Sequence, residues 1–285
     1  PRLKKHKREM RCRQMKKTTK WMLTGAAAYM AAITPRLFNR PERMPKVYYA
    51  HRGLHDNDSE APENTLAAFR LAVEKGYGIE LDVQVTRDGR AVVAHDYNLQ
   101  RICGVDKDID AVTYEELKKY PILNSQETVP LFADVLELVN GQVPLIVELK
   151  CKNRKSLVCE MADSLLKDYK GIYCIESFNP AVLLWYRLNR PEVCRGQLSS
   201  NFPKHDGNKT LAHYAMRHLL TNFLTAPDFI AYNCQDKKAL SLNLCRAVFG
   251  CPAVAWTIRS QDELSSCRDY FDYFIFEGFE PDEKN

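Results

Sequence analysis

Short apolar runs alternate with amphipathic stretches about eight times between residues 47 and 281, and no other feature of the sequence constrains the fold as strongly. The predicted strands are the apolar or period-two runs 47–50, 78–85, 90–94, 145–149, 172–175, 195–198, 229–232, 253–258 and 273–276. The predicted helices are the amphipathic runs 65–75, 131–139, 156–169, 181–188, 238–249 and 260–270. Repeated strand–helix units of this kind predict an α/β fold.

Two α/β architectures fit this alternation, an open doubly wound sheet and a (β/α)8 TIM-type barrel. The number and length of the predicted strands favour the barrel. The sequence also contains no glycine-rich dinucleotide fingerprint and no phosphate-binding P-loop, which are the usual markers of the open sheet. In a barrel, functional side chains lie at the carboxyl ends of the strands, so polar residues at those places are the candidates for a site.

The charge of the chain is unevenly distributed. Residues 1–20 hold ten Lys or Arg and one Glu, a net charge of +9, whereas the whole chain carries +5, which leaves −4 on the remainder. The predicted folded part therefore lacks the basic face that nucleic-acid binding requires, and no nucleic-acid partner is expected for it. The basic tail itself is compatible with contacts to anionic lipid or RNA.

The uncharged stretch 21–33 has 13 residues, whereas a membrane-spanning helix needs about 20. It is compatible with a signal peptide, a short membrane anchor or a surface helix. Residues 34–46 hold three Pro and predict a linker. We therefore expect two parts, a basic and apolar amino-terminal segment with its linker over 1–46 and a barrel domain over 47–285. Membrane association through residues 21–33 would follow from the anchor reading.

The ten cysteines form no C-x-x-C pair and fit no zinc module, so reduced, structural thiols are expected. Many free thiols favour a reducing compartment. The amino-terminal segment instead favours a membrane-associated or exported protein, so a cytoplasmic location is the alternative. The sequence does not indicate the oligomeric state.

Three acidic residues follow predicted core strands. Glu80 and Asp82 stand two apart on one strand and point to the same face, and Glu148 lies on a neighbouring strand. Carboxylates crowded in a barrel interior repel one another unless a cation joins them, and a set of oxygen ligands favours Mg²⁺ or Ca²⁺ over Zn²⁺. The alternative is that Lys150 or Arg52 neutralises these acids in ion pairs.

His51 and His95 each follow an apolar strand beside the predicted carboxylate cluster. A single His at such a place is more often structural, but two beside a carboxylate cluster favour a general base and a general acid. Arg52 and Lys150 would then bind a phosphodiester anion, Arg through its planar fork and Lys as a point charge.

Six separated motifs resemble those of the glycerophosphodiester phosphodiesterase family in identity, order and spacing. They are Ala50-His-Arg-Gly53; Ala61-Pro-Glu-Asn-Thr65; Glu80-Leu-Asp-Val-Gln-Val-Thr86 with Asp88-Gly89 and His95-Asp96; Val147-Glu-Leu-Lys150; Glu176-Ser-Phe178; and Ala255-Trp-Thr-Ile258. The resemblance covers residues 47–281. It implies a metal-dependent phosphodiesterase in which a substrate hydroxyl attacks phosphorus and water opens the resulting cyclic phosphate.

The resemblance also implies roles for individual residues. The implied metal ligands are Glu80, Asp82 and Glu148; the acid–base pair is His51 and His95; the phosphate-binding residues are Arg52 and Lys150. Glu63 would support the site from behind or begin a helix, and Glu176 would line the site. Trp256 would pack against the glycerol or the leaving group, or belong to the core. Residues 96–129 would form the family's small insertion, with Tyr97 and Leu99 near the mouth.

Two regions depart from the family pattern. Residues 274–281 replace a common Thr-Asp and Pro ending, and Arg259 stands where an Asn is common. We expect both changes at the rim, where they would affect substrate choice and leave the metal site untouched. The leading prediction is hydrolysis of a glycerophosphodiester to glycerol phosphate and an alcohol. The alternatives are a membrane-associated lysophospholipase D, a hydrolase of glycerol-phosphate polymer, or an inactive barrel that serves as a binding module.

Overall fold

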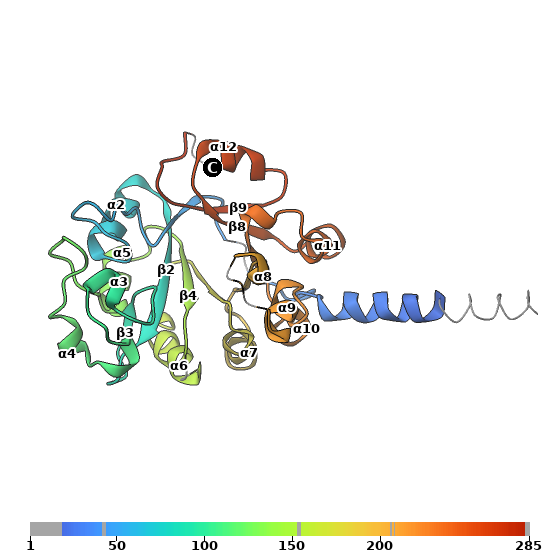
Figure 1. The fold of residues 1–285 in the computed structure, drawn as a ribbon, viewed down its shortest axis with the longest axis horizontal. Helices are drawn as coiled ribbons and strands as arrows, with labels where there is room; N and C mark the ends of the chain where they lie inside the picture. Colours follow the sequence, from blue (N-terminus) through green and yellow to red (C-terminus); the bar gives the residue numbers. More distant parts are fainter. Residues whose placement is uncertain (1–18, 42–43, 153–154, 206, 208, 283–285) are drawn as a thin grey trace, which may run out of the picture.

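The computed structural model describes residues 19–41, 44–152, 155–205, 207 and 209–282. Within these residues eight parallel strands form a closed barrel (Figure 1), which confirms the predicted fold class. The strands are β1 (Tyr48–His51), β2 (Gly78–Val85), β4 (Leu145–Leu149), β5 (Tyr173–Ser177), β6 (Arg195–Ser199), β7 (Phe229–Asn233), β8 (Ala253–Ile258) and β9 (Tyr273–Phe276). Strand β1 pairs with both β2 and β9, and these two pairings close the sheet. The short β3 (Ala91–Val93) pairs antiparallel with β2.

The longer helices lie between the strands, as the amphipathic runs predict. They are α2 (Leu66–Lys75), α5 (Phe132–Val139), α6 (Lys155–Leu166), α7 (Pro180–Asn189), α11 (Leu240–Phe249) and α12 (Gln261–Cys267). Helix α2 shows how the sequence sets these bounds, because the Thr65 side chain accepts a hydrogen bond from the Ala68 N–H and Gly76 ends the helix in the left-handed conformation.

The connection between β6 and β7 was not predicted to be helical. It contains the short helices α8 (Phe202–His205), α9 (Leu211–Arg217) and α10 (Asn222–Thr225). No residue of α9 is buried, and α8 and α10 have only four residues each, too few for a helical period to be recognised.

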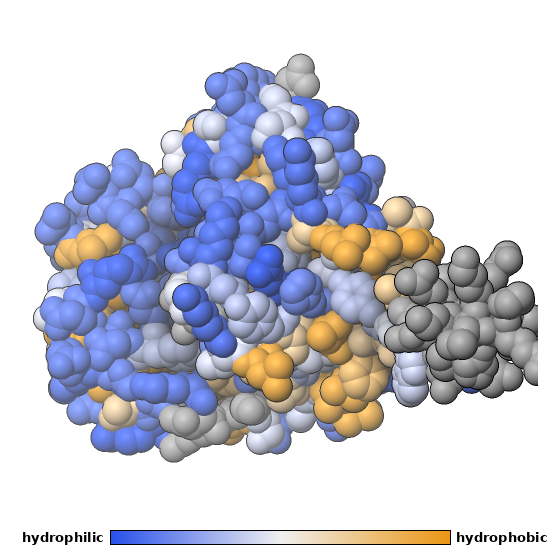
Figure 2. All heavy atoms as spheres, turned by 45° about the vertical axis from the view of Figure 1, so that its right-hand side comes forward, coloured by the Kyte–Doolittle hydropathy of each residue, from blue (hydrophilic) through white to orange (hydrophobic). Residues whose placement is uncertain are grey.

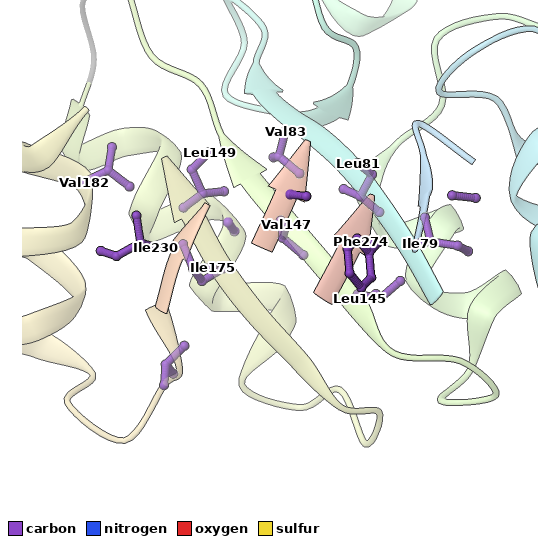
Figure 3. Close-up of a cluster of buried hydrophobic side chains, with 14 of the residues drawn as sticks. Ile79, Leu81, Val83, Leu145, Val147, Leu149, Ile175, Val182, Ile230 and Phe274 are labelled. Atoms are coloured by element: carbon purple, nitrogen blue, oxygen red, sulfur yellow. The ribbon is translucent and has the colours of Figure 1, made fainter. Parts of the chain in front are cut away.

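The two faces of each strand have different roles. Figure 3 shows Ile79, Leu81 and Val83 of β2 on the outer face, in one apolar layer with Leu145, Val147 and Leu149 of β4 and Val182 of α7. Because side chains alternate along a strand, the residues between them face the barrel interior. The period-two pattern of β2 therefore places Glu80, Asp82 and Gln84 inside.

The amino-terminal half of the barrel interior is apolar. It is filled by Tyr49, Ile146, Cys174, Leu198, Phe229, Ala231, Val254, Tyr273 and Ile275, together with Met44 from the preceding segment. The Tyr273 hydroxyl donates a hydrogen bond to the Met44 carbonyl at 3.0 Å, and the Tyr49 hydroxyl donates to the Pro45 carbonyl at 3.1 Å. Met44 and Pro45, near the end of the predicted linker, thus lie against the floor of the barrel.

Residues 19–32 are helical and project from the side of the barrel (Figure 1). The chain then turns onto the barrel, where Ile33 is fully buried and its carbonyl accepts a hydrogen bond from Asn222 at 3.0 Å. Arg36 forms an ion pair with Asp228 at 3.2 Å.

Among the residues that the structure describes, no helix is both long and apolar enough to cross a membrane. The domain boundary near Lys46 stays a prediction, and the packing contacts begin ahead of it.

The insertion after β3 folds around a core of its own. It contains α3 (Gln100–Cys103), the 3-10 turn η1 (Ile109–Ala111) and α4 (Tyr114–Leu117). Its core consists of Val92, Ala94, Leu99, Ile102, Ile109, Val112, Leu117, Ile122 and Val129. Leu99, which we expected near the mouth, is fully buried in this core because its apolar side chain has partners within the insertion, whereas Tyr97 is 40% exposed.

Candidate active site

The register of the parallel strands brings the predicted acidic residues together. Asp82 of β2 pairs with Glu148 of β4, and Glu148 pairs with Glu176 of β5. On the other side, His51 at the end of β1 pairs with Glu80 of β2. The carboxylates of all four acids are buried in the barrel interior, toward the carboxyl ends of the strands. Adjacent strands in register therefore place four acids and one imidazole in neighbouring positions.

Three of these acids form a compact set of oxygen ligands. One carboxylate oxygen from each of Glu80, Asp82 and Glu148 lies within 4.8 Å of the other two. Burial and the negative charge of Asp82 raise the pKa of Glu80 above its ordinary value. Burial also raises the pKa of Glu148, against the opposing charge of Lys150. Crowded oxygens with raised pKa values are the arrangement that a hard divalent cation stabilises.

Two cations lie among the acids, as the ion-pair alternative expected. The Lys150 ammonium is 3.2 Å from Asp82 and 3.0 Å from Glu148. The Nε atom of Arg52 is 3.5 Å from Asp82. Burial disfavours the charged form of Asp82, but Lys150 and the other nearby cations hold its pKa well below the usual range.

These ion pairs do not balance the charge of the interior. Four carboxylates (Glu80, Asp82, Glu148 and Glu176) surround two permanent cations, so the group has an excess of two negative charges when all its members are ionised. Burial raises the pKa of Glu176 well above its ordinary value, and its Oε2 atom has no hydrogen-bond partner among the described residues. The donor set and the charge excess both fit one divalent cation.

The turn after β1 aims Arg52 at the site. Arg52 has a φ of 57° and Gly53 a φ of 84°, and the Arg52 N–H donates a hydrogen bond to Glu80 at 3.2 Å. A Cβ atom on Gly53 would lie 2.9 Å from the backbone of Ala68 in α2, so the turn needs a glycine for both conformation and space. The guanidinium also pairs with Glu63 at 2.7 Å, while its Nε lacks a hydrogen bond within the described part of the chain.

Each candidate catalytic histidine has a carboxylate at its Nδ1 atom. Glu277 contacts Nδ1 of His51, and Asp96 lies 2.6 Å from Nδ1 of His95. A partner on Nδ1 fixes the ring and leaves Nε2 for chemistry. Burial lowers the pKa of His51 to about 4, although Glu277 opposes this shift, so the ring is neutral near pH 7. Its Nε2 atom is 3.8 Å from Glu80.

Several supporting residues were not anticipated from the sequence. The Gln84 amide donates hydrogen bonds to the carbonyls of Ala94, His95 and Asp96 and so holds the loop that carries the second histidine. The Asn64 amide donates to Asp82 at 2.9 Å. Gln84 continues the inward-facing series of β2, a signal that was available, whereas the reach of Asn64 depends on a turn that the sequence does not specify.

The two departures from the family pattern contact each other. We expected Arg259 and residues 274–281 at the rim, where they would affect substrate choice and leave the metal site untouched. Arg259 lies 2.6 Å from Glu277, and Glu277 contacts His51. Glu277 reaches His51 because β9 pairs with β1 and the residue after β9 therefore lies beside the end of β1.

Glu63 and Trp256 lie at the edges of the group. Glu63 accepts hydrogen bonds from Arg52 and Arg101, and these cations, against the effect of burial, lower the pKa of Glu63 to about 2. It therefore supports Arg52 from behind. Trp256 makes a perpendicular ring contact with Phe178 at 5.5 Å, and its indole N–H is buried without a described partner. This position is compatible with contact to the glycerol or the leaving group and with packing in the core, the two roles expected for Trp256.

Known proteins resemble this chain in sequence and in fold. Residues 51–270 match the Glycerophosphoryl diester phosphodiesterase family. A glycerophosphodiester phosphodiesterase of Bacillus altitudinis is 41% identical over 117 residues, 39% of this chain and 46% of the relative. A lysophospholipase D, GDPD1, of Rattus norvegicus is 30% identical over 144 residues, 46% of this chain and 44% of the relative. The chain thus spans about half the length of these curated relatives.

A solved structure extends the similarity over most of the fold. A phosphodiesterase of Oleispira antarctica, solved with the product sn-glycerol-3-phosphate, superposes with a TM-score of 0.66 at 24% identity. The superposition covers 82% of this chain and 93% of that protein. The match over residues 51–270 covers well over half of the chain, from the end of β1 to the segment before β9, and the chain therefore belongs to the glycerophosphoryl diester phosphodiesterase family.

Proposed function

We propose that this protein is a metal-dependent phosphodiesterase that cleaves glycerophosphodiesters to glycerol phosphate and an alcohol. The observation that carries the proposal is the buried group Glu80, Asp82 and Glu148 beside two histidines that each have a carboxylate at Nδ1. A barrel that had become a binding module would have no need to keep these costly buried charges in place.

The protein residues divide the proton transfers between them. His51 is neutral near pH 7 and accepts the proton of the attacking substrate hydroxyl through Nε2. His95, whose Nδ1 atom lies 2.6 Å from Asp96, donates a proton to the leaving alkoxide as its bond to phosphorus breaks, and water then opens the resulting cyclic phosphate to give glycerol phosphate. Arg52 and Lys150 hold the phosphodiester anion. Glu80, Asp82 and Glu148 would hold the cation, which when bound would supply Lewis-acid polarisation of the phosphoryl oxygens.

The substrate class draws support from the relatives. The Oleispira antarctica phosphodiesterase binds sn-glycerol-3-phosphate as a product, and the Bacillus altitudinis relative is a glycerophosphodiester phosphodiesterase. The carboxylate ligands favour Mg²⁺ or Ca²⁺ for this chain as well.

The test is release of glycerol phosphate from glycerophosphocholine by the full chain, treated with EDTA and then given Mg²⁺ or Ca²⁺. The full chain is needed because Ile33 and Arg36 pack on the barrel. We expect EDTA to remove turnover and one ion to restore it, while Asp82→Asn stays inactive and Asp58→Asn, in the exposed loop after β1, behaves as the wild type. Metal-independent turnover, or an active Asp82→Asn, would contradict the metal assignment.

A second candidate, a membrane-associated lysophospholipase D, is favoured by an exposed apolar surface. The side chains of Trp21 and Phe38 are 75% and 80% exposed, and Leu37, Phe38 and Phe223 line a groove of about 830 Å³. Figure 2 shows apolar side chains gathered on the side of the molecule from which the amino-terminal helix projects. Residues 21–33 would then bind a lipid surface and give a membrane-associated location, with cytoplasmic or exported protein as the alternatives.

This candidate is tested by comparing lysophosphatidylcholine micelles with glycerophosphocholine, and by flotation with vesicles of phosphatidylcholine and phosphatidylglycerol. We expect vesicle binding that Trp21→Asp and Phe38→Asp weaken, with Leu211→Asp on α9 as the control for a single exposed apolar residue. Turnover of glycerophosphocholine alone, without vesicle binding, would select the leading proposal over this one.

A further inference from the structure

We propose that His51, His55 and Glu277 form a second cation site, suited to a transition-metal ion such as Zn²⁺, and that an ion bound there inhibits the enzyme. One ligand atom from each of the three residues lies within 4.8 Å of the other two. The three come from separate segments: the end of β1, the loop that follows it, and the residue after β9. The barrel closure between β1 and β9 brings them together.

His55 is the residue that most needs an explanation. Both of its ring nitrogens are buried, and neither has a hydrogen-bond partner in the described part of the chain. A neutral imidazole has one donor and one acceptor nitrogen, and leaving both unpaired away from water costs free energy. Buried unpaired groups of this kind indicate a bound water or ion. Burial also lowers the pKa of His55, which keeps the ring in the neutral form that metals bind.

The ligand set differs in kind from the carboxylate group beside it. Two imidazole nitrogens and one carboxylate suit Zn²⁺ and its transition-metal neighbours, whereas Mg²⁺ and Ca²⁺ prefer oxygen. Glu80 lies 3.8 Å from His51 and adds negative charge to the surroundings. Arg259 pairs with the other oxygen of Glu277 and orients that carboxylate, and its guanidinium is 60% exposed, so water screens its charge.

The inhibitory effect rests on the proposed function of His51. An imidazole that coordinates an ion through Nε2 cannot accept the proton of a substrate hydroxyl there. If His51 binds the ion through Nδ1, beside Glu277, the single proton of the neutral ring lies on Nε2, which then cannot accept another. A bound transition-metal ion would therefore remove the general base without touching Glu148 or Lys150.

Binding is tested first, without reference to activity. The full chain is titrated calorimetrically with ZnCl₂ in excess Mg²⁺, which occupies the carboxylate site. We expect His55→Gln to weaken Zn²⁺ binding at least about tenfold, the effect usual for changes at a metal site. His213→Gln on α9 is the matched control. Glu148→Gln, which alters the carboxylate group alone, should bind Zn²⁺ as the wild type does. Equal affinity of His55→Gln and the wild type would overturn the proposed site.

Cobalt separates this site from the thiols of the chain. Co²⁺ bound by imidazole and carboxylate gives visible absorption without the near-ultraviolet sulfur-to-cobalt band that a thiolate ligand produces. We expect visible absorption that is lost in His55→Gln and kept in His213→Gln. A dominant sulfur-to-cobalt band of equal strength in all three proteins would place the ion on cysteines and sink the proposal.

The activity arm uses glycerophosphocholine in excess Mg²⁺ with increasing Zn²⁺, and each variant is compared with its own zinc-free rate. We expect the half-inhibiting Zn²⁺ concentration to rise at least about tenfold in His55→Gln relative to His213→Gln, following the change in affinity. Zn²⁺ binding that depends on His55 but accelerates turnover would overturn the inhibitory role. Absence of turnover in zinc-free enzyme would contradict the proposed function, while the binding result would still decide the site.

Discussion

One guanidinium nitrogen of Arg259 lies 2.6 Å from a carboxylate oxygen of Glu277, and the other oxygen of Glu277 contacts the imidazole of His51. A chain of contacts therefore runs from the residue after β8, through the residue after β9, to the end of β1. The Glu277 side chain is 19% exposed, and its carboxylate contacts both Arg259 and His51. Glu277 therefore links these two residues. The orientation of the candidate base depends on two residues that depart from the family pattern.

Replacing Glu277 should therefore impair turnover more than substrate binding. We expect Glu277→Gln to lower kcat about tenfold or more with little change in KM, because the amide no longer fixes the charge and tautomer of His51. Arg259→Ala should cause a smaller loss that Arg259→Lys partly restores. The control is Glu280→Gln, whose carboxylate is half exposed beside Lys75. A change confined to KM would mean that Glu277 contacts substrate instead.

Removing one acid from the metal-free cluster should stabilise the fold. The folded-state pKa of Glu80 is raised above its ordinary value of 4.5, so its ionisation opposes folding once the pH exceeds that value. In EDTA, the free energy of unfolding should fall as the pH rises from about 4.5, and Glu80→Gln should remove part of that fall.

Urea denaturation at several pH values measures this effect. Glu80→Gln should be more stable than the wild type at pH 7 in EDTA while it loses metal-dependent turnover. Glu137→Gln, an exposed acid on α5, serves as the control. Lower stability of Glu80→Gln at pH 7 would show that the acids are already balanced without a divalent ion.

Gln84 should matter for both stability and catalysis. Its amide supports three consecutive carbonyls next to His95, at 2.7, 3.2 and 2.8 Å. We expect Gln84→Ala to cost about 1–3 kcal/mol in the free energy of unfolding, the range for an unpaired buried polar group. The kcat should fall as well, since the loop that carries His95 loses its support. Gln142→Ala, in the exposed turn after α5, removes an amide that also donates to carbonyls and should change neither quantity appreciably.

The segment before the barrel should contribute to stability. Ile33 is fully buried against the barrel. We expect Ile33→Ala to cost about 2–5 kcal/mol in the free energy of unfolding, the range for a truncated core side chain, whereas Leu23→Ala at an exposed helical position should cost little. Thermal unfolding of the two variants measures the difference. Equal melting temperatures would mean that the barrel folds independently of this segment.

The barrel could be predicted well from the sequence because each strand is a short apolar run or a run in which apolar and polar residues alternate. The alternation in β2 identified both the buried strand and the inward direction of Glu80 and Asp82, and the register with β4 then placed Glu148 beside them. The contacts between loops could not be predicted in this way. Glu277 reaches His51 only because β9 closes onto β1, and His55 lies in a loop whose course depends on the positive φ values of Arg52 and Gly53.

The contacts of Ile33, Arg36 and Met44 with the barrel fix where the amino-terminal helix is attached to it. Asn222 holds the Ile33 carbonyl, Asp228 holds Arg36, and the floor of the barrel holds Met44. Residues 21–23 are thus joined to the barrel at a defined place and not through a free tether. If a lipid surface binds these residues, these contacts also fix the orientation of the barrel relative to that surface. The amino-terminal segment would then determine from which side substrates reach the active site.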